Sequence, residues 1–195
     1  MPFKALNHHL IMFSKKIDSN FLIIKTGSIN TNNAETTLKK LTIKSNPTIT
    51  MISLKPVASI EQIESAFFHS LDAFENKTNT TKNIQLEFLL FLTAQKQLDK
   101  ALEEMQLLGK EEVAIVGFGS NKKTILNELK ILEKEIKFKE NKKLIQKNLK
   151  KNYNYLKQFF AITNNELSVL QSKNKFDGLQ KSVLEKIALT KIGEN

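Results

Sequence analysis

The stretch Glu87 to Ala101, EFLLFLTAQKQLDKA, decides how this chain folds. Residues 88–92 are apolar and point all round a helix axis, and a helix of that kind is buried on every side. The residues that follow are mixed, with Leu98 and Met105 on an apolar stripe and polar side chains between them. The pattern predicts one unbroken helix that starts in the core and ends with a polar face at the surface.

Composition sets the class of protein. A chain of 195 residues with 41% hydrophobic content has enough apolar material for one core of ordinary size. Cysteine is absent, which excludes disulfides, a thiolate nucleophile and a thiol-based zinc site, and which suits a reducing compartment. The first residues, MPFKALNHHLIMF, lack the apolar region of a signal peptide, and no apolar run approaches the ~20 residues of a membrane span. We expect a cytoplasmic protein without a membrane partner.

The net charge of +10 has two explanations. Lysines that neutralise phosphates would bind a polyanion, whereas an A/T-rich genome would enrich lysine, asparagine and isoleucine in any soluble protein. All thirty basic residues are lysine and none is arginine. Because bidentate recognition of guanine mostly uses arginine, sequence-specific duplex recognition is disfavoured. A nucleic-acid contact would therefore be to the backbone or to unstacked bases.

Short strands and amphipathic helices share the chain, with the strands in its first part. Ser59 and Gln62 form a predicted capping box for a helix that ends near Phe74, and the buried helix begins near Asn83. The predicted strands are His9–Phe13, Phe21–Lys25, Thr48–Leu54 and Val113–Gly117, and the later predicted helices are Thr124–Leu132, a lysine-rich stretch to about Phe160, Thr163–Leu170 and Val183–Leu189. This order predicts one α+β domain over residues 1–195, with a small mixed or antiparallel sheet and a mostly helical C-terminal half.

Two tracts stand apart from this pattern. Residues 133–151 contain eight lysines and three glutamates, so this tract is either a basic helix that binds RNA backbone or a solvated surface. Residues 26–45 are rich in threonine and asparagine and predict a loop with one short helix at residues 35–41.

Catalytic motifs are weak. Gly117, Gly119 and Ser120 suggest a turn between a strand and a helix, which either holds a phosphate or is simply tight, and Lys122 stands where a dinucleotide fingerprint needs glycine. The three histidines show no metal-ligand spacing, and His69 lies in an apolar helical context that suits a structural residue. We expect no catalytic residue, metal or cofactor.

The run Glu87, Leu89, Leu90, Gln97, Leu98 and Ala101 resembles the signature of the small kinase-binding subunit of the KEOPS complex, the family called TPRKB in animals. Lys96 stands where the family usually has arginine. The resemblance continues through the helix at residues 59–74 and the strand at residues 113–117 to the closing LEKIAL segment. It covers most of the chain except the tracts at residues 27–46 and 133–155.

The resemblance implies an archaeal-type, non-catalytic adaptor of a complex that attaches a threonylcarbamoyl group to an adenosine of tRNA. The implied site for the single-stranded 3′ end of tRNA has Lys96 and Lys100 facing phosphates, Gln97 at a base edge and Leu98 as an apolar platform. Without the resemblance, spacing alone would make Leu98 a core residue. Lysine in place of arginine keeps the charge but loses planar stacking.

The implied partner is the small atypical kinase of that complex, with other KEOPS subunits contacted indirectly and no small-molecule substrate. The candidate residues for this contact are Leu184, Ile187 and Ala188 in the closing helix, where core packing is the competing explanation for each one. Two alternative functions remain open: a stand-alone RNA-binding protein that uses the lysine-rich tract, and a small enzyme that binds a phosphorylated ligand at Gly117–Ser120.

Overall fold

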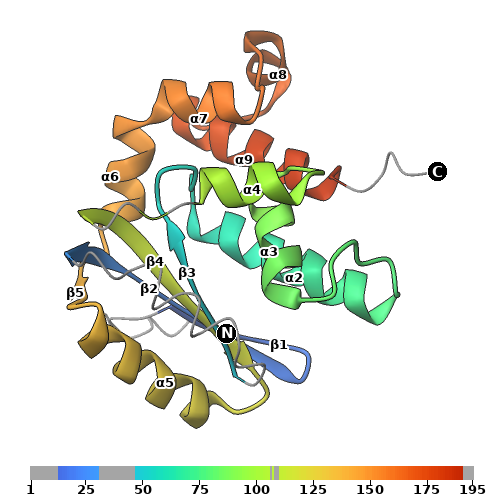
Figure 1. Cartoon of the computed structure of the whole chain (residues 1–195). Helices are drawn as coiled ribbons and strands as arrows, with labels where there is room; N and C mark the ends of the chain where they lie inside the picture. The colour runs from blue at the N-terminus through green and yellow to red at the C-terminus, as the bar shows by residue number, and fades with distance from the viewer. Residues whose placement is uncertain (1–12, 31–46, 106, 108–109, 191–195) are drawn as a thin grey trace, which may run out of the picture.

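A five-stranded antiparallel sheet forms the centre of the computed structural model, which describes residues 13–30, 47–105, 107 and 110–190 (Figure 1). The strands run in the order β1-β2-β4-β3, and β5 pairs with β2 beyond the end of β1. Their bounds are β1 Phe13–Ile17, β2 Asn20–Asn30, β3 Thr48–Ser53, β4 Lys110–Gly119 and β5 Lys139–Glu140.

Helices cover both faces of the sheet. The helix α5 lies alone on one face, and the other described helices gather on the opposite face (Figure 1). Their bounds are α2 Ile60–Glu75, α3 Ile84–Thr93, α4 Leu98–Glu104, α5 Lys122–Glu135, α6 Leu144–Lys151, α7 Tyr153–Phe159, α8 Asn164–Val169 and α9 Lys175–Ala188. The α+β prediction is confirmed. None of the described helices has the length and apolarity needed to cross a bilayer.

Alternation along the central strands builds two separate cores. On β2, Leu22 and Ile24 face the larger core with α2, α3 and α9, whereas Ile23 faces α5. The neighbouring strand β4 repeats this arrangement, with Val116 in the larger core and Ile115 under α5. Successive side chains of a strand point to opposite faces, so a nearly continuous apolar run is the expected pattern for a sheet covered on both sides.

Most of the turn predicted at Gly117–Ser120 is strand, because β4 continues to Gly119. Gly117 lies inside β4, where it is paired with both Ile23 and Ile49, and a Cβ atom there would collide with the side chain of Ile125 on α5. This glycine therefore brings a helix close to the sheet and does not hold a phosphate. The turn is shorter than predicted, and the Asn121 side chain caps α5 by accepting hydrogen bonds from two backbone N–H groups.

The strand β2 is longer than predicted and creates a partner site for β5. Residues 26–30, expected in a loop, continue the strand, and Ile29 is buried. β5 pairs with Gly27 and Ser28, although the lysine-rich tract showed no strand pattern. The expected helix at residues 35–41 and residues 9–12 of the first predicted strand lie outside the described residues; Phe13 begins β1.

The buried helix α3 is confirmed, and a carboxylate anchors it from within. Glu87 is fully buried, and its oxygens accept hydrogen bonds from the Thr80 and Thr81 N–H groups, the latter at 2.8 Å, and from the Thr81 hydroxyl at 3.0 Å. A buried charge is tolerated only when it is hydrogen-bonded in this way. Glu87 therefore ties the loop between α2 and α3 to the core.

The capping box predicted at the start of α2 is half correct. The Ser59 hydroxyl accepts a hydrogen bond from the Gln62 N–H at 3.1 Å. The Gln62 side chain, however, reaches past Ser59 and accepts from the Ala58 N–H at 2.6 Å, while its amide donates to the Leu92 carbonyl at 2.9 Å. Gln62 thus joins the start of α2 to the end of α3.

Replacing Glu87 with glutamine keeps the side-chain shape but turns an acceptor oxygen into a donor that faces N–H groups. Leaving buried donors without an acceptor costs about 1–3 kcal/mol, so we expect Glu87→Gln to lower the free energy of unfolding by that amount in urea denaturation. The control is Glu75→Gln, because Glu75 is exposed at the end of α2. Equal stability of E87Q and wild type would contradict the anchoring role.

Candidate functional site

The chain leaves α3 through a sharp break, so the prediction of one continuous helix over residues 87–101 is wrong. Ala94 adopts a left-handed conformation with φ of 50°. Its N–H donates to the Phe91 carbonyl and the next N–H, of Gln95, donates to the Leu90 carbonyl, each at 3.0 Å. This pair of bonds is the Schellman motif, which usually has glycine at the left-handed position. Because this position holds alanine, which is a good helix former, nothing in the sequence indicated the break.

The break places the predicted RNA-binding residues together at the start of α4. Lys96 and Gln97 lie in the short connection between the helices, and Lys100 lies in the first turn of α4; all three are exposed. Leu98 is partly buried, and Ala101 below it is fully buried. Leu98 is thus neither fully buried nor fully exposed, and its role in RNA binding stays a prediction.

Among the residues that the structure describes, the polar side chains of this cluster have no ion-pair or helix-capping partner. Gln97 precedes α4 as its N-cap residue, but its side chain makes no capping hydrogen bond. Neither Lys96 nor Lys100 forms an ion pair with a described carboxylate. We name residues 96, 97, 98 and 100 the α4 cluster. It presents an amide, two ammonium groups and an apolar edge to solvent.

A groove of about 640 Å³ forms the second candidate surface. Its floor is apolar, with Phe68 from α2 and Leu184 and Ala188 from α9, and Phe68 is 49% exposed although it is large and aromatic. The β1–β2 hairpin forms one wall, where Lys15 is ion-paired with Glu64 of α2. We name this feature the α2–α9 groove.

The three residues predicted to contact a kinase separate in the structure. Leu184 and Ala188 line the α2–α9 groove, but Ile187 is fully buried in the larger core. Its predicted contact role is corrected, because the side chain is already covered on every side within this chain. Phe68 was missed by sequence reasoning, since its position beside the buried Phe67 gave no sign that the ring faces solvent.

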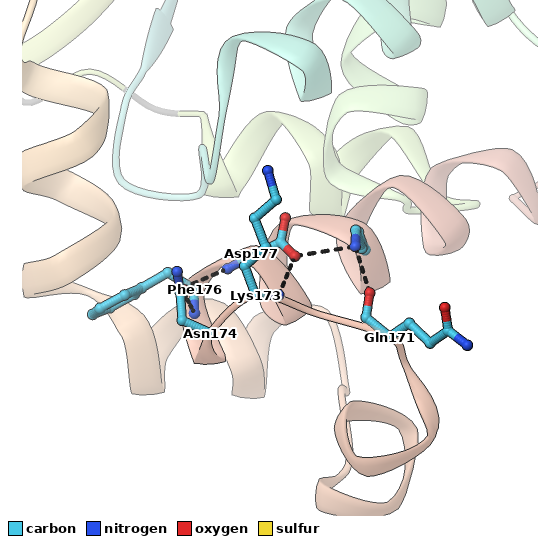
Figure 2. Close-up of polar contacts among 6 residues, drawn as sticks. Gln171, Lys173, Asn174, Phe176 and Asp177 are labelled. Carbon is cyan, nitrogen blue, oxygen red and sulfur yellow. Dashed lines mark hydrogen bonds and ion pairs between the residues drawn. The ribbon is translucent and has the colours of Figure 1, made fainter.

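The start of α9 is held by polar contacts that orient the groove-lining helix (Figure 2). The Asn174 side chain accepts from the N–H groups of Phe176 and Asp177, and the Asp177 carboxylate accepts from the Lys173 N–H at 2.8 Å. Asp177 also pairs with Lys181 at 3.0 Å. The hydrogen bond from the Lys173 backbone N–H, and to a smaller extent the one from the Lys181 side chain, lower the pKa of Asp177. The helix therefore begins at Lys175, eight residues before the predicted start.

His69 is a structural residue of α2 in this arrangement. Its ring stacks on Phe91 at 5.4 Å and meets the edge of Phe68 at 5.7 Å. Burial lowers the pKa of His69, and the nearby Asp72 carboxylate opposes that shift. The His69 ring therefore contacts both Phe68 and Phe91. The described residues contain no group of three side chains suited to hold a metal ion.

Replacing Ala94 with glycine removes the cost of a left-handed conformation for an L-residue. After allowance for the greater freedom of glycine in the unfolded chain, we expect a gain of about 0.5–1 kcal/mol in the free energy of unfolding. The matched control is Ala161→Gly, because Ala161 follows α7 with the same φ of 50°. A loss of stability in A94G beside a gain in A161G would show that the break after α3 is misplaced.

Comparison with known proteins bears directly on these two surfaces. A search of curated proteins finds no match to the chain. A family model described as kinase binding protein CGI-121 matches residues 29–191. The matched range includes the α4 cluster, the lysine-rich tract and the α2 and α9 sides of the groove, but not its hairpin wall at residues 15–18. It agrees with the resemblance carried by residues 87–101. The chain therefore belongs to the CGI-121 family of kinase-binding proteins, the KEOPS kinase-binding subunit family.

Proposed function

We propose that this protein is a non-catalytic adaptor of a KEOPS-type tRNA-modifying complex. In this role it binds the small kinase of the complex through the α2–α9 groove and the single-stranded 3′ end of tRNA through the α4 cluster. The observation that carries the proposal is membership of the kinase-binding family together with an exposed α4 cluster whose lysines form no ion pair with a described residue. The threonylcarbamoyl chemistry would take place on another subunit.

The α4 cluster has the chemical features that a single-stranded RNA end requires. Unpaired bases expose both their edges and their faces, so a protein can hydrogen-bond one and pack against the other. The Gln97 amide offers a donor and an acceptor for a base edge, and Leu98 offers an apolar surface beside it. Lys96 and Lys100 would neutralise the phosphates that flank such a base.

The α2–α9 groove has the features of a protein-binding site. Large aromatic residues contribute most when they enter the buried centre of an interface, and Phe68 already projects into the groove with half of its surface exposed. Glu61 and Leu184 also line an adjoining groove of about 480 Å³, whose lining includes Gln146 and Gln180. An apolar floor continuous with a polar margin is the usual organisation of a protein interface.

Tethering explains how a subunit without catalytic groups would assist the reaction. Binding the kinase and the tRNA at two separate surfaces makes the second encounter intramolecular, which raises the effective concentration of tRNA near the active site of its partner. The two surfaces use different residues of the chain. Variants of the α4 cluster should therefore change RNA binding without changing kinase binding, and variants of the groove should do the opposite.

The RNA site is tested with tRNA that carries an intact 3′ end and with the same tRNA after trimming, at fixed salt. Leu98→Glu removes the apolar surface beside the base and places a carboxylate near the phosphates, and like-charge contacts cost several kcal/mol, so the variant should weaken binding of intact tRNA about tenfold or more. The control is Val169→Glu, because Val169 is 80% exposed on α8. Unchanged affinity after both trimming and the Leu98 substitution would refute the proposed RNA site.

The groove is tested with purified kinase from the same complex by calorimetry. Truncation of a central aromatic residue typically costs about 2 kcal/mol or more, so Phe68→Ala should weaken kinase binding at least tenfold, and Leu184→Asp should abolish it. Val169→Asp serves as the surface control. Wild-type affinity in both groove variants, with circular dichroism showing that they are folded, would place the kinase elsewhere.

A further inference from the structure

A strip of exposed lysines follows the edge of the sheet from one face of the molecule to the other. It begins at the end of α5, passes along β5 and continues on α6, and these elements lie on opposite sides of the sheet (Figure 1). All of its lysines are exposed. We name it the lysine strip, and it consists of Lys134, Lys137, Lys139, Lys142, Lys143, Lys147, Lys150 and Lys151.

The strip is built on a fixed backbone. β5 lies close to Gly27 of β2, where a Cβ atom would come within 2.5 Å of the Lys139 carbonyl oxygen, so only glycine admits this pairing without displacement. Asn141 follows β5 and its N–H donates to the Thr26 carbonyl at 2.8 Å. The buried Asn148 amide of α6 donates to the carbonyls of Leu54 and Val57 at 2.6 and 2.8 Å.

Two of the three glutamates of this tract interact with a lysine outside the strip, whereas Glu135 is exposed and forms no ion pair with a described residue. Glu133 and Glu140 both interact with Lys25 of β2, and the Glu140 contact is 4.0 Å. Within the strip, only Lys147 has a described carboxylate within ion-pair distance, Glu112 at 3.9 Å. The other seven lysines form no ion pair with a described residue. Eight lysines stand against three glutamates in this tract, and Glu140, which also interacts with Lys142, shares its charge with Lys25, so the strip keeps an excess of positive charge.

The arrangement on α6 favours a row of phosphates. Lys143, Lys147, Lys150 and Lys151 follow at intervals of four, three and one residues, so they share one side of the helix, while Leu144 and Leu149 face the core. At about 1.5 Å per residue the row is roughly 12 Å long. Lysine is a flexible point charge that contacts phosphates without reading bases.

We propose that the lysine strip binds the phosphate backbone of double-stranded RNA, as a second contact separate from the single-stranded end at the α4 cluster. The identity of that RNA as tRNA rests on the proposed function. An anionic membrane is the competing partner, but membrane-surface segments also present large apolar side chains. The exposed large hydrophobic residues among the described ones are Phe68, Leu102, Ile131, Val169 and Leu189. Only Ile131, one turn before Lys134 on α5, lies beside the strip, and none lies on β5 or α6.

The test compares the triple variant K143Q/K150Q/K151Q with a charge-matched control, K77Q/K82Q/K173Q, whose lysines are also exposed and unpaired among the described residues. The probe is a blunt RNA duplex without a single-stranded end. We expect the strip variant to bind it at least tenfold more weakly at low salt, and to reduce the slope of log K against log salt by about 2–3, since each lost phosphate contact contributes about 0.9 for a duplex. The control variant should bind within about twofold of wild type.

Two further arms separate the outcomes. A single-stranded RNA with the sequence of the tRNA 3′ end should bind the strip variant normally but bind Leu98→Glu weakly. If Leu98→Glu binds this RNA as well as wild type does, the proposed α4 site is contradicted, but the strip is still supported by its duplex result. Equal duplex binding by the strip and control variants would overturn the inference. Selective loss of binding to phosphatidylserine vesicles, with duplex binding intact, would overturn it in favour of a membrane.

Discussion

The burial of α3 on every side is the constraint on which the rest of the structure depends. This helix is ten residues long and lies against α2, α4 and α9. Gln85 joins it to the sheet by donating to the Ile49 carbonyl at 2.9 Å, and Gln62 joins its last turn to the start of α2. Because its apolar side chains would be costly to expose, the surrounding helices must enclose it. The chain therefore has to turn sharply at Ala94 to return to the surface.

That turn links core packing to the candidate RNA site. If α3 continued without a break, residues 96 and 97 would lie on a helix, where their orientation would follow that of the core residues before them. The left-handed conformation of Ala94 instead ends α3, so residues 96 and 97 no longer follow the helical repeat of the core residues, and α4 starts in a new direction. Ala101 is fully buried and Met105, which follows α4, belongs to the larger core, whereas the amide and ammonium groups of the α4 cluster are exposed.

The apolar groove and the lysine strip lie on different parts of the molecule, the groove between α2 and α9 and the strip along one edge of the sheet. The larger core of the sheet is covered by helices whose packing leaves an apolar groove between α2 and α9, with Phe68 in it. The open edge of the sheet is occupied by β5, which the absence of a side chain at Gly27 admits. The lysines on both sides of β5 thus form one continuous surface. A very short edge strand of charged residues is also protected from pairing with the edge of another molecule.

Local patterns predicted several elements correctly, and the reasons are local. The helix predicted to begin near Asn83 does so, with the Asn83 side chain as its cap, and the reciprocal bonds between Thr163 and Glu166 form a complete capping box at the helix predicted to start there. The burial of residues 88–92 followed from their unbroken apolarity. The break at Ala94 was missed for a local reason, because alanine stands where the motif usually has glycine. The other errors arose where two distant segments meet. Gly117 is small because α5 crosses it, and residues 26–30 are a strand because β4 and β5 pair with them.

The sequence by itself determined the α+β class, the fully buried helix, the family signature around residues 87–101 and the excess of lysine. Each of these is a property of composition or of spacing within one segment. Only the tertiary structure decided that Ile187 lies inside while Leu184 and Ala188 share a groove with Phe68. It also decided that Lys25 engages Glu133 and Glu140, which lie 108 and 115 positions away along the chain. Periodicity reports how much of an element is buried, but the partner that buries it comes from elsewhere in the chain, and so does the charge that neutralises it.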